Sequence, residues 1–201
     1  HVRDRVVVVT GASSGIGLAV TSMMARAGAR VIMVARGEEK LAEALKEVRA
    51  MGGKAWSYSC DVSDLEACDS LIDQIMEDHG ASDAGLSIRR SISLSYDRFH
   101  DFERTMQLNY FGCLRLILRA LPGMAARRKG HVINISSIGV LTNSPRFSAY
   151  VASKAALDAF SRCASAEYSD TGVAFTTINM PLVRTPMIAP TKMYDNVPTI
   201  S

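Results

Sequence analysis

A tyrosine and a lysine four residues apart form a pair that can do acid–base chemistry. Tyr150 and Lys154 lie in a segment, Tyr150 to Arg162, whose pattern predicts a helix, and this spacing places both side chains on one helix face. A free tyrosine has a pKa of about 10 and donates protons poorly at neutral pH, but a neighbouring cation lowers the pKa of a phenol. The spacing alone also fits an ordinary surface pair, so the hypothesis needs a second signal.

That second signal is a glycine-rich turn near the N-terminus. The β-branched run from Val6 to Thr10 predicts a buried strand, and the residues from Gly15 onward predict a helix capped by Ser13 or Ser14. The turn between them is Gly11-Ala12-Ser13-Ser14-Gly15-Ile16-Gly17. Missing side chains let a pyrophosphate approach backbone N–H groups and the positive end of the helix dipole. The alternative is an ordinary tight turn between a strand and a helix.

Composition limits the kinds of protein that remain. A chain of 201 residues with 48% hydrophobic residues fits one folded domain and excludes disorder. A net charge of +3, from 23 basic and 20 acidic residues, is too balanced to indicate nucleic acid or an acidic membrane surface as a partner. No segment is long and apolar enough to span a membrane, and no signal peptide is recognisable, so we expect a cytoplasmic protein. No Cys-x-x-Cys or His spacing indicates a metal site, and we expect reduced thiols at Cys60, Cys68, Cys113 and Cys163.

Predicted strands and helices alternate along the chain. This order predicts an α/β fold, a doubly wound parallel sheet with helices on both faces in three α/β/α layers. The predicted strands are Val6 to Thr10, Arg30 to Ala35, Lys54 to Ser59, His131 to Ser136 and Val173 to Asn179. The predicted helices are Gly15 to Ala27, Glu38 to Met51, Leu65 to His79, about Arg98 to Arg128, and the segment that begins at Tyr150.

The alternation breaks between residues 79 and 98. A strand is due there, but residues 80–85 contain no apolar run, whereas central parallel strands are usually continuous apolar runs. Either the fold lacks this central strand, or residues near 81–85 are missing from the sequence. We favour missing residues, and we expect further residues after 201.

With the glycine turn and the Tyr150–Lys154 pair both in view, the chain resembles the short-chain dehydrogenase/reductase family over nearly its whole length. Residues 10–17 resemble the family's cofactor turn, and Tyr150 and Lys154 its catalytic pair. Ser137, thirteen residues before Tyr150, matches the catalytic serine, and Asn109 matches the helix asparagine. The resemblance implies a Rossmann-type fold and a single NAD(P)-binding domain over residues 1–201.

Further segments extend this resemblance around the cofactor. Asp61 and Val62 match the pair that contacts adenine. The segment near the nicotinamide is matched by Pro181, Val183 and Thr185, with Leu182 in place of the usual glycine. The family's Asn-Asn-Ala-Gly segment, which ends its fourth strand, is reduced here to Asp83-Ala84-Gly85. A finer resemblance, to the reductase domain of bacterial fatty acyl-CoA reductases and similar actinobacterial oxidoreductases, is carried by residues 87–91, 96–106 and 180–191.

The resemblance and the chemistry together suggest a role for each site residue. Tyr150 is the candidate general acid, and Lys154 would lower its pKa and bind the nicotinamide ribose. Ser137 can donate a hydrogen bond where charge develops on the substrate oxygen, and we prefer it to its neighbour Ser136 because of its spacing from Tyr150. Asn109, by resemblance, holds a water in a proton relay, and the alternative is a residue that kinks its helix.

The second strand bears on the choice of cofactor. An Asp or Glu about 20 residues beyond the glycines favours NAD, whereas an Arg nearby accommodates the 2′-phosphate of NADP. Arg36 lies nineteen residues past Gly17, so we expect NADP(H) rather than NAD(H). The acidic residues Glu38 and Glu39 instead fit the first turn of the next helix.

Three hypotheses about function follow. The first is an NADPH-dependent oxidoreductase that transfers hydride to the carbonyl of a hydrophobic acyl or aldehyde substrate, and the second is a 3-oxoacyl thioester reductase. The third is a cofactor-binding module without turnover, suggested by the eroded segment at Asp83 to Gly85. By resemblance, we expect a homodimer or homotetramer formed through the helices that contain Leu114 to Leu121 and Leu157 to Phe160.

Overall fold

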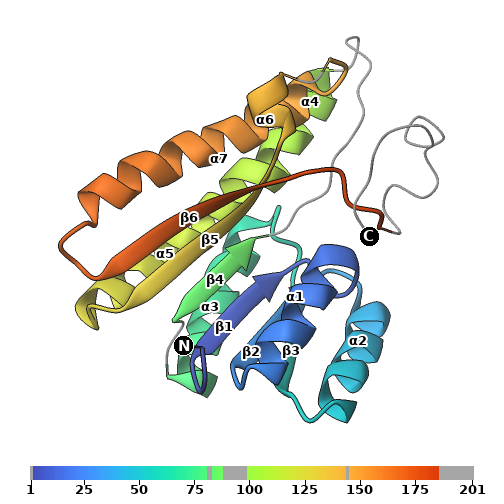
Figure 1. Ribbon diagram of the computed structural model, residues 1–201, viewed down its shortest axis with the longest axis vertical. Helices are drawn as coiled ribbons and strands as arrows, with labels where there is room; N and C mark the ends of the chain where they lie inside the picture. The colour runs from blue at the N-terminus through green and yellow to red at the C-terminus, as the bar shows by residue number, and fades with distance from the viewer. Residues whose placement is uncertain (1, 81–82, 88–98, 144, 186–201) are drawn as a thin grey trace.

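A single six-stranded sheet organises the molecule (Figure 1). The computed structural model describes residues 2–80, 83–87, 99–143 and 145–185. All strand pairs are parallel, in the order β3-β2-β1-β4-β5-β6. The strands are β1 (Val6–Thr10), β2 (Arg30–Ala35), β3 (Lys54–Ser59), β4 (Ala84–Ser87), β5 (Gly130–Ser137) and β6 (Val173–Met180). The predicted doubly wound α/β fold is confirmed.

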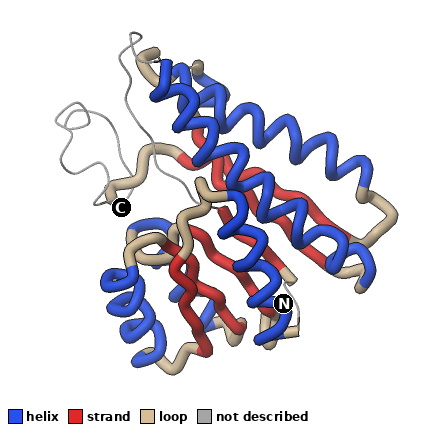
Figure 2. Tube along the Cα trace, turned by 180° about the vertical axis from the view of Figure 1, so that it is seen from behind, coloured by secondary structure: helices blue, strands red, loops and turns tan. Residues whose placement is uncertain are grey.

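Helices cover both faces of this sheet. The near side in Figure 1 carries α1 and α2, and the helices in front in Figure 2 cover the opposite face. Most predicted helices are found within one or two residues of their expected ends, as is usual for helix boundaries. The helices are α1 (Gly15–Arg26), α2 (Glu38–Ala50), α3 (Leu65–His79), α4 (Phe99–Met106), α5 (Gly112–Ala126), α6 (Gly139–Thr142) and α7 (Ser148–Glu167).

The valine run of β1 explains why this strand lies at the centre. Val7 and Val9 belong to the apolar core under α1 and α2, whereas Val6 and Val8 belong to the core under α3 and α5. Successive side chains of a strand point to opposite faces, so a strand buried on both faces must be apolar at every position. A third core joins α5 and α7 to β5 and β6.

The alternative that the fold lacks a central strand is wrong, because β4 fills that place. Its backbone pairs with β1 on one side and with β5 on the other, with Gly85 opposite Val8 and Val132. Asp83 starts this pairing: its N–H donates to the Val6 carbonyl at 2.9 Å, and its carboxylate accepts from the Val6 N–H at 3.1 Å. Backbone hydrogen bonds to two neighbouring strands therefore hold β4 in place.

This placement changes the meaning of the segment that resembled Asn-Asn-Ala-Gly. Ala84 and Gly85 lie at the start of β4, so they do not form the segment that follows the end of a strand. A Cβ added at Gly85 would meet no atom within 4 Å, and an apolar pocket lies beside this residue. The backbone pairing at the centre of the sheet is thus complete, and Gly85 leaves space beside it. That residues are missing near 81–85 stays a prediction.

The long predicted helix contains an irregular turn. The turn η1 (Gln107–Phe111) is π-helical and joins α4 to α5, where the sequence predicted a regular helix. Gly112 follows it, and a Cβ built on Gly112 would lie 1.9 Å from the carbonyl oxygen of Val62. Only glycine therefore allows this close approach. Single π-helical turns are often found at functional sites.

Candidate active site

The predicted site residues converge on one edge of the sheet. Because all strands are parallel, their carboxyl ends meet at this edge, where open α/β sheets bind ligands. The glycine turn follows β1, Arg36 follows β2, and Ser137 ends β5. Pro181 and Val183 follow β6 at the same edge, and Asp61 lies just past β3. The segments 88–98 and 186–191, which carry part of the finer resemblance, lie outside the described residues.

The glycine turn has a backbone that other residues rarely adopt. Gly11 and Gly15 have φ angles of +70° and +54°, in the left-handed region that favours glycine. A Cβ built on Gly17 would lie 2.0 Å from the carbonyl oxygen of Gly11, so the turn and α1 meet without room for a side chain. Thr185 packs here too, because its Cγ2 atom lies 3.3 Å from a Cβ built on Gly15. The structure therefore brings together predicted site residues from both ends of the chain.

The N-terminus of α1 is left open by its own side chains. Ser14 occupies the cap position, but its side chain makes no capping hydrogen bond, and the first turn contains no acidic residue. By contrast, α3 is capped by Asp64, whose carboxylate accepts from the N–H groups of Glu66 and Ala67 at 3.0 Å each. Helix N–H groups without a side-chain acceptor suit an external anion. The glycine turn and the open end of α1 thus fit the pyrophosphate of a dinucleotide, with Ser13, Ser14 and Ile16 beside it.

Arg36 and Asp61 face each other across the ends of β2 and β3. The guanidinium Nη1 lies 3.6 Å from the carboxylate Oδ2, and the two side chains are 59% and 43% exposed. Burial raises the pKa of Asp61, but hydrogen bonds from Ser63 and the charge of Arg36 outweigh it and lower the pKa overall. Asp61 is therefore a carboxylate beside an accessible cation. Val62 is 1% exposed and its side chain lies in the core, so the structure leaves little of this residue accessible to a ligand.

Lys154 joins helix α7 to strand β5 at the catalytic end of the sheet. Its ammonium Nζ donates to the carbonyl of Ile135 at 2.7 Å and lies 5.9 Å from the centre of the Tyr150 ring. The residue is 2% exposed, which is rare for a lysine whose charge has no role. The structure therefore places the Lys154 cation near the Tyr150 ring, as the four-residue spacing predicted.

The two candidate serines at the end of β5 differ in accessibility. Ser136 is buried, and its hydroxyl has no partner among the described residues. Ser137 is partly exposed, and its hydroxyl accepts from the N–H of Gly139 at 3.1 Å, which leaves its proton for another acceptor. This geometry agrees with the preference for Ser137.

Asn109 lies in the π-helical turn and is fully buried. Its Nδ2 donates to the hydroxyl of Ser153 at 3.0 Å, whereas its Oδ1 has no partner among the described residues. The turn thus directs Asn109 toward α7, the helix of Tyr150 and Lys154. Gly112 and Ser153 were not among the predicted site residues. A glycine inside a predicted helix could have signalled the first, but no local pattern marks the second.

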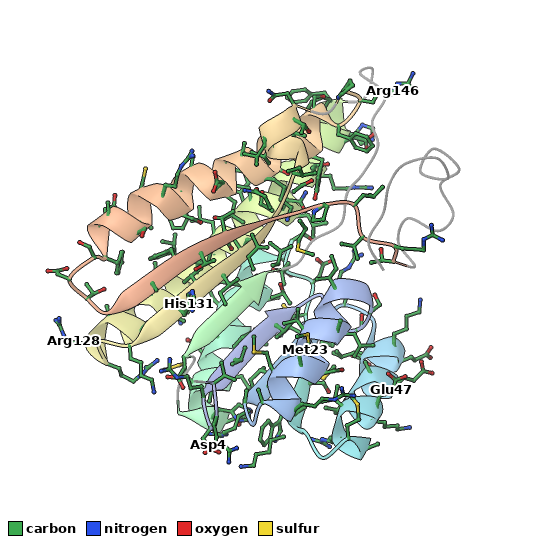
Figure 3. The ribbon with its side chains drawn as sticks, in the orientation of Figure 1. Asp4, Met23, Glu47, Arg128, His131 and Arg146 are labelled. Carbon is green, nitrogen blue, oxygen red and sulfur yellow. The ribbon has the colours of Figure 1, made fainter. Side chains whose placement is uncertain are left out.

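His131 lies away from the sheet edge that holds the predicted site residues. His131, labelled in Figure 3, is at the opposite end of β5 from Ser137 and pairs with Thr176 at 2.9 Å. Among the described residues, no group of three or more His, Cys, Asp or Glu side chains is placed to hold a metal ion. None of the helices in this described part of the chain has the length and apolar character needed to cross a membrane.

Comparisons with known proteins identify the family of this chain. Residues 5–195 match the family model of the short chain dehydrogenases. A fatty acyl-CoA reductase of Acinetobacter baylyi is 57% identical over 206 aligned positions, which cover 100% of this chain and 70% of that protein. An uncharacterized oxidoreductase of Mycobacterium bovis is 50% identical over 208 positions, with 100% of this chain and 61% of that protein covered.

A solved structure supports the same assignment. An actinorhodin polyketide ketoreductase variant, crystallised with NADPH, superposes with a TM-score of 0.90 at 29% identity, covering 98% of this chain and 78% of the other. The parallel sheet, the glycine turn before α1 and the Tyr150–Lys154 pair thus occur in a chain similar to a reductase crystallised with NADPH. The chain belongs to the short-chain dehydrogenase/reductase family, whose members are nicotinamide-dependent oxidoreductases.

Proposed function

We propose that this protein uses NADPH to reduce the carbonyl group of a hydrophobic acyl or aldehyde substrate. The observation that carries the proposal is the buried Lys154 ammonium, held 2.7 Å from the Ile135 carbonyl and 5.9 Å from the centre of the Tyr150 ring. In general, a cation held beside a phenol favours the phenolate and makes the phenol a better acid. The chain spans 61–70% of the length of the two relatives described above, so the activity is proposed for the whole protein.

Each catalytic residue has a distinct task in this reduction. A bound nicotinamide supplies the hydride for the carbonyl carbon. Tyr150 donates its phenolic proton to the substrate oxygen as negative charge develops there, and it accepts a proton in the reverse direction. Ser137 donates a hydrogen bond to the same oxygen, where a fixed donor stabilises the transition state more than the ground state. Lys154 stabilises the Tyr150 phenolate after the proton has left, and Asn109 holds a water for the return of a proton.

The preference for NADPH rests on Arg36. Its guanidinium is exposed beyond β2, close to the glycine turn, and a guanidinium fork matches the geometry of a phosphate. We expect Arg36→Ala to weaken NADPH binding by on the order of 10-fold while NADH binding changes little. Calorimetric titration with both cofactors measures this difference. An equal loss for NADH and NADPH would contradict the assignment of Arg36 to the 2′-phosphate.

Apolar side chains next to Ser137 support a hydrophobic substrate. Ile138 and Leu141 directly follow the end of β5 and are 41% and 64% exposed. The name of the fatty acyl-CoA reductase at 57% identity points to acyl substrates. The likeness to a polyketide ketoreductase keeps a 3-oxoacyl thioester as the second candidate. Turnover of a fatty aldehyde, an acyl-CoA and a 3-oxoacyl thioester with NADPH separates these substrates.

The mechanism is tested by removing one phenolic oxygen. Tyr150→Phe should lower kcat by roughly 100-fold or more, because loss of a general acid typically costs 10²–10⁴ in rate. Tyr168→Phe, at the far end of α7, is the matched control and should keep the activity. Aldehyde-dependent NADPH oxidation that survives in Tyr150→Phe would rule out this mechanism.

We also propose that two copies associate through α5 and α7. On α5, Leu118 is 48% exposed and Phe111, just before it, is 44% exposed. Large apolar side chains exposed two turns apart along one continuous helical stretch favour burial against a partner. Light scattering of Leu118→Lys should show more monomer than the unchanged protein.

A further inference from the structure

Ser153 lies one residue before Lys154 on α7 and is completely buried. Its hydroxyl donates to the backbone carbonyl of Tyr150 at 2.7 Å. The Ser153 hydroxyl oxygen also accepts a hydrogen bond from Asn109 Nδ2 at 3.0 Å. Ser153 therefore links the helical turn of Tyr150 to the π-helical turn between α4 and α5.

This link also determines the orientation of the Asn109 amide. A serine hydroxyl has one proton, and Ser153 uses it for the Tyr150 carbonyl. Asn109 must therefore present its NH₂ group to Ser153, and its Oδ1 is left as the acceptor. That Oδ1 is buried and has no partner in the part of the chain that the structure describes. A buried acceptor of this kind suits an ordered water.

Lys154 holds the same turn of α7 from the other side. Its ammonium donates to the Ile135 carbonyl on β5, while Ser153 connects to Asn109 on the π-helical turn. We propose that Ser153 is a positioning residue, which fixes the Tyr150 turn against Asn109, the residue that the resemblance assigns to the proton relay. This inference rests on the proposed function, and it adds a residue that acts through Asn109 and Tyr150.

The chain contains a matched control for this link. Ser161, two turns further along α7, accepts from Asn134 Nδ2 at 2.7 Å and donates to the Leu157 carbonyl at 2.8 Å. It is 3% exposed, and the Asn134 Oδ1 also has no partner among the described residues. Each serine thus accepts from an asparagine amide and donates to a backbone carbonyl one turn earlier in α7. Only Ser153 makes these bonds to Tyr150 and to a residue of the candidate relay.

The experiment compares Ser153→Ala with Ser161→Ala in the full chain. Both variants should show a similar fall in Tm, because each loses the same pair of buried hydrogen bonds. Ser153→Ala should lower kcat by roughly 10- to 100-fold with little change in KM, since small misplacements of catalytic groups are costly. Ser161→Ala should keep kcat within about 2-fold. Equal kcat losses in the two variants would make Ser153 a structural residue only.

A double-mutant cycle tests whether Ser153 acts through Asn109. If it does, Asn109→Ala with Ser153→Ala should be about as slow as the slower single variant, because residues that act as a unit are not additive. Multiplicative losses would overturn the link. Ser153→Thr retains a hydroxyl and should recover part of the rate.

A third measurement keeps this inference separate from the proposed function. NMR titration of ¹³C-labelled tyrosine, with Tyr150→Phe for assignment, follows the Tyr150 phenol without any substrate. A shifted titration midpoint in Ser153→Ala, but not in Ser161→Ala, supports the positioning role even if no carbonyl substrate is turned over. An unchanged midpoint together with equal activity losses would refute it.

Discussion

Helices α1 and α3 differ at their N-termini in how their first backbone N–H groups are satisfied. Asp64 satisfies two N–H groups of α3 with its own carboxylate. Ser14 makes no such bond at α1, whose first turn also contains no acid. Since α3 meets its own hydrogen-bonding needs, its start contributes stability, whereas the first N–H groups of α1 have no side-chain acceptor and suit an external anion. The difference is the one expected between a structural helix end and the proposed binding one.

The largest effect should come from closing the turn that leads into α1. Gly17→Ala places a Cβ 2.0 Å from the Gly11 carbonyl oxygen, where only backbone could move to relieve the clash. We expect a loss of unfolding free energy of about 3 kcal/mol and loss of measurable NADPH binding. Thermal unfolding and calorimetry check both.

The matched control for this prediction is Gly37→Ala at the start of α2. A Cβ there meets nothing within 4 Å, and its φ of −86° suits any residue. Its unfolding free energy should change by less than about 0.5 kcal/mol. Normal cofactor binding by Gly17→Ala would show that the turn is an ordinary one.

The second prediction concerns a substitution that gives α1 a carboxylate cap like that of α3. Ser14→Asp adds a carboxylate at an extended cap position, with φ −166° and ψ 167°. The free protein should gain about 0.5–1 kcal/mol of unfolding free energy. NADPH affinity should fall by on the order of 10-fold, because the new charge repels the pyrophosphate. Unchanged affinity measured by calorimetry would place the cofactor elsewhere.

The third prediction compares the loss of the two N-terminal side chains, Asp64 at α3 and Ser14 at α1. Asp64→Ala should cost about 1 kcal/mol of unfolding free energy, because two N–H groups of α3 lose their acceptor. Ser14→Ala should cost much less, since no capping bond is lost. Denaturant titration measures both, and NADPH binding should be preserved in Asp64→Ala. Equal costs at the two positions would remove the distinction between the two helix ends.

The smallest expected effect concerns the other ends of these helices. The last turn of α1 contains Arg26, whereas α3 ends at His79, whose Nδ1 accepts from Arg30 at 3.3 Å and whose Nε2 lies 3.0 Å from the Tyr58 hydroxyl. Burial first, and then the charge of Arg30, lower the pKa of His79 below its usual 6.5. Burial and the hydrogen bond to Asp78 raise the pKa of Tyr58 to about 12.

A lowered histidine pKa makes stability depend on pH in a definite direction. The unfolded chain takes up a proton at higher pH than the folded one, so stability is complete above pH 6.5 and falls as the pH drops through the folded pKa. His131, whose pKa is also lowered by burial, adds to the same slope. His79→Gln should therefore reduce, but not abolish, the loss of Tm between about pH 7 and 5. An unaltered slope would assign the whole effect to other groups.

Much of this molecule could be predicted because the signals are local. The valine run of β1, the helical pattern of α3 and the four-residue spacing of Tyr150 and Lys154 are properties of single segments. Parallel strands then bring their carboxyl ends to one edge, so the glycine turn and Ser137 had to share a site.

The remaining features depend on contacts between segments that are distant in the sequence. β4 has little apolar character and exists because β1 and β5 offer backbone groups on both sides. Ser153 and Ser161 look alike in sequence, yet only Ser153 meets Asn109, since the π-helical turn brings that amide to α7. The sequence by itself determined most of the elements and the chemical groups, because periodicity and propensity act within a segment. The tertiary structure alone decided the pairing of β4 and the link from Asn109 to Tyr150, because a hydrogen bond between distant segments requires both to be in place.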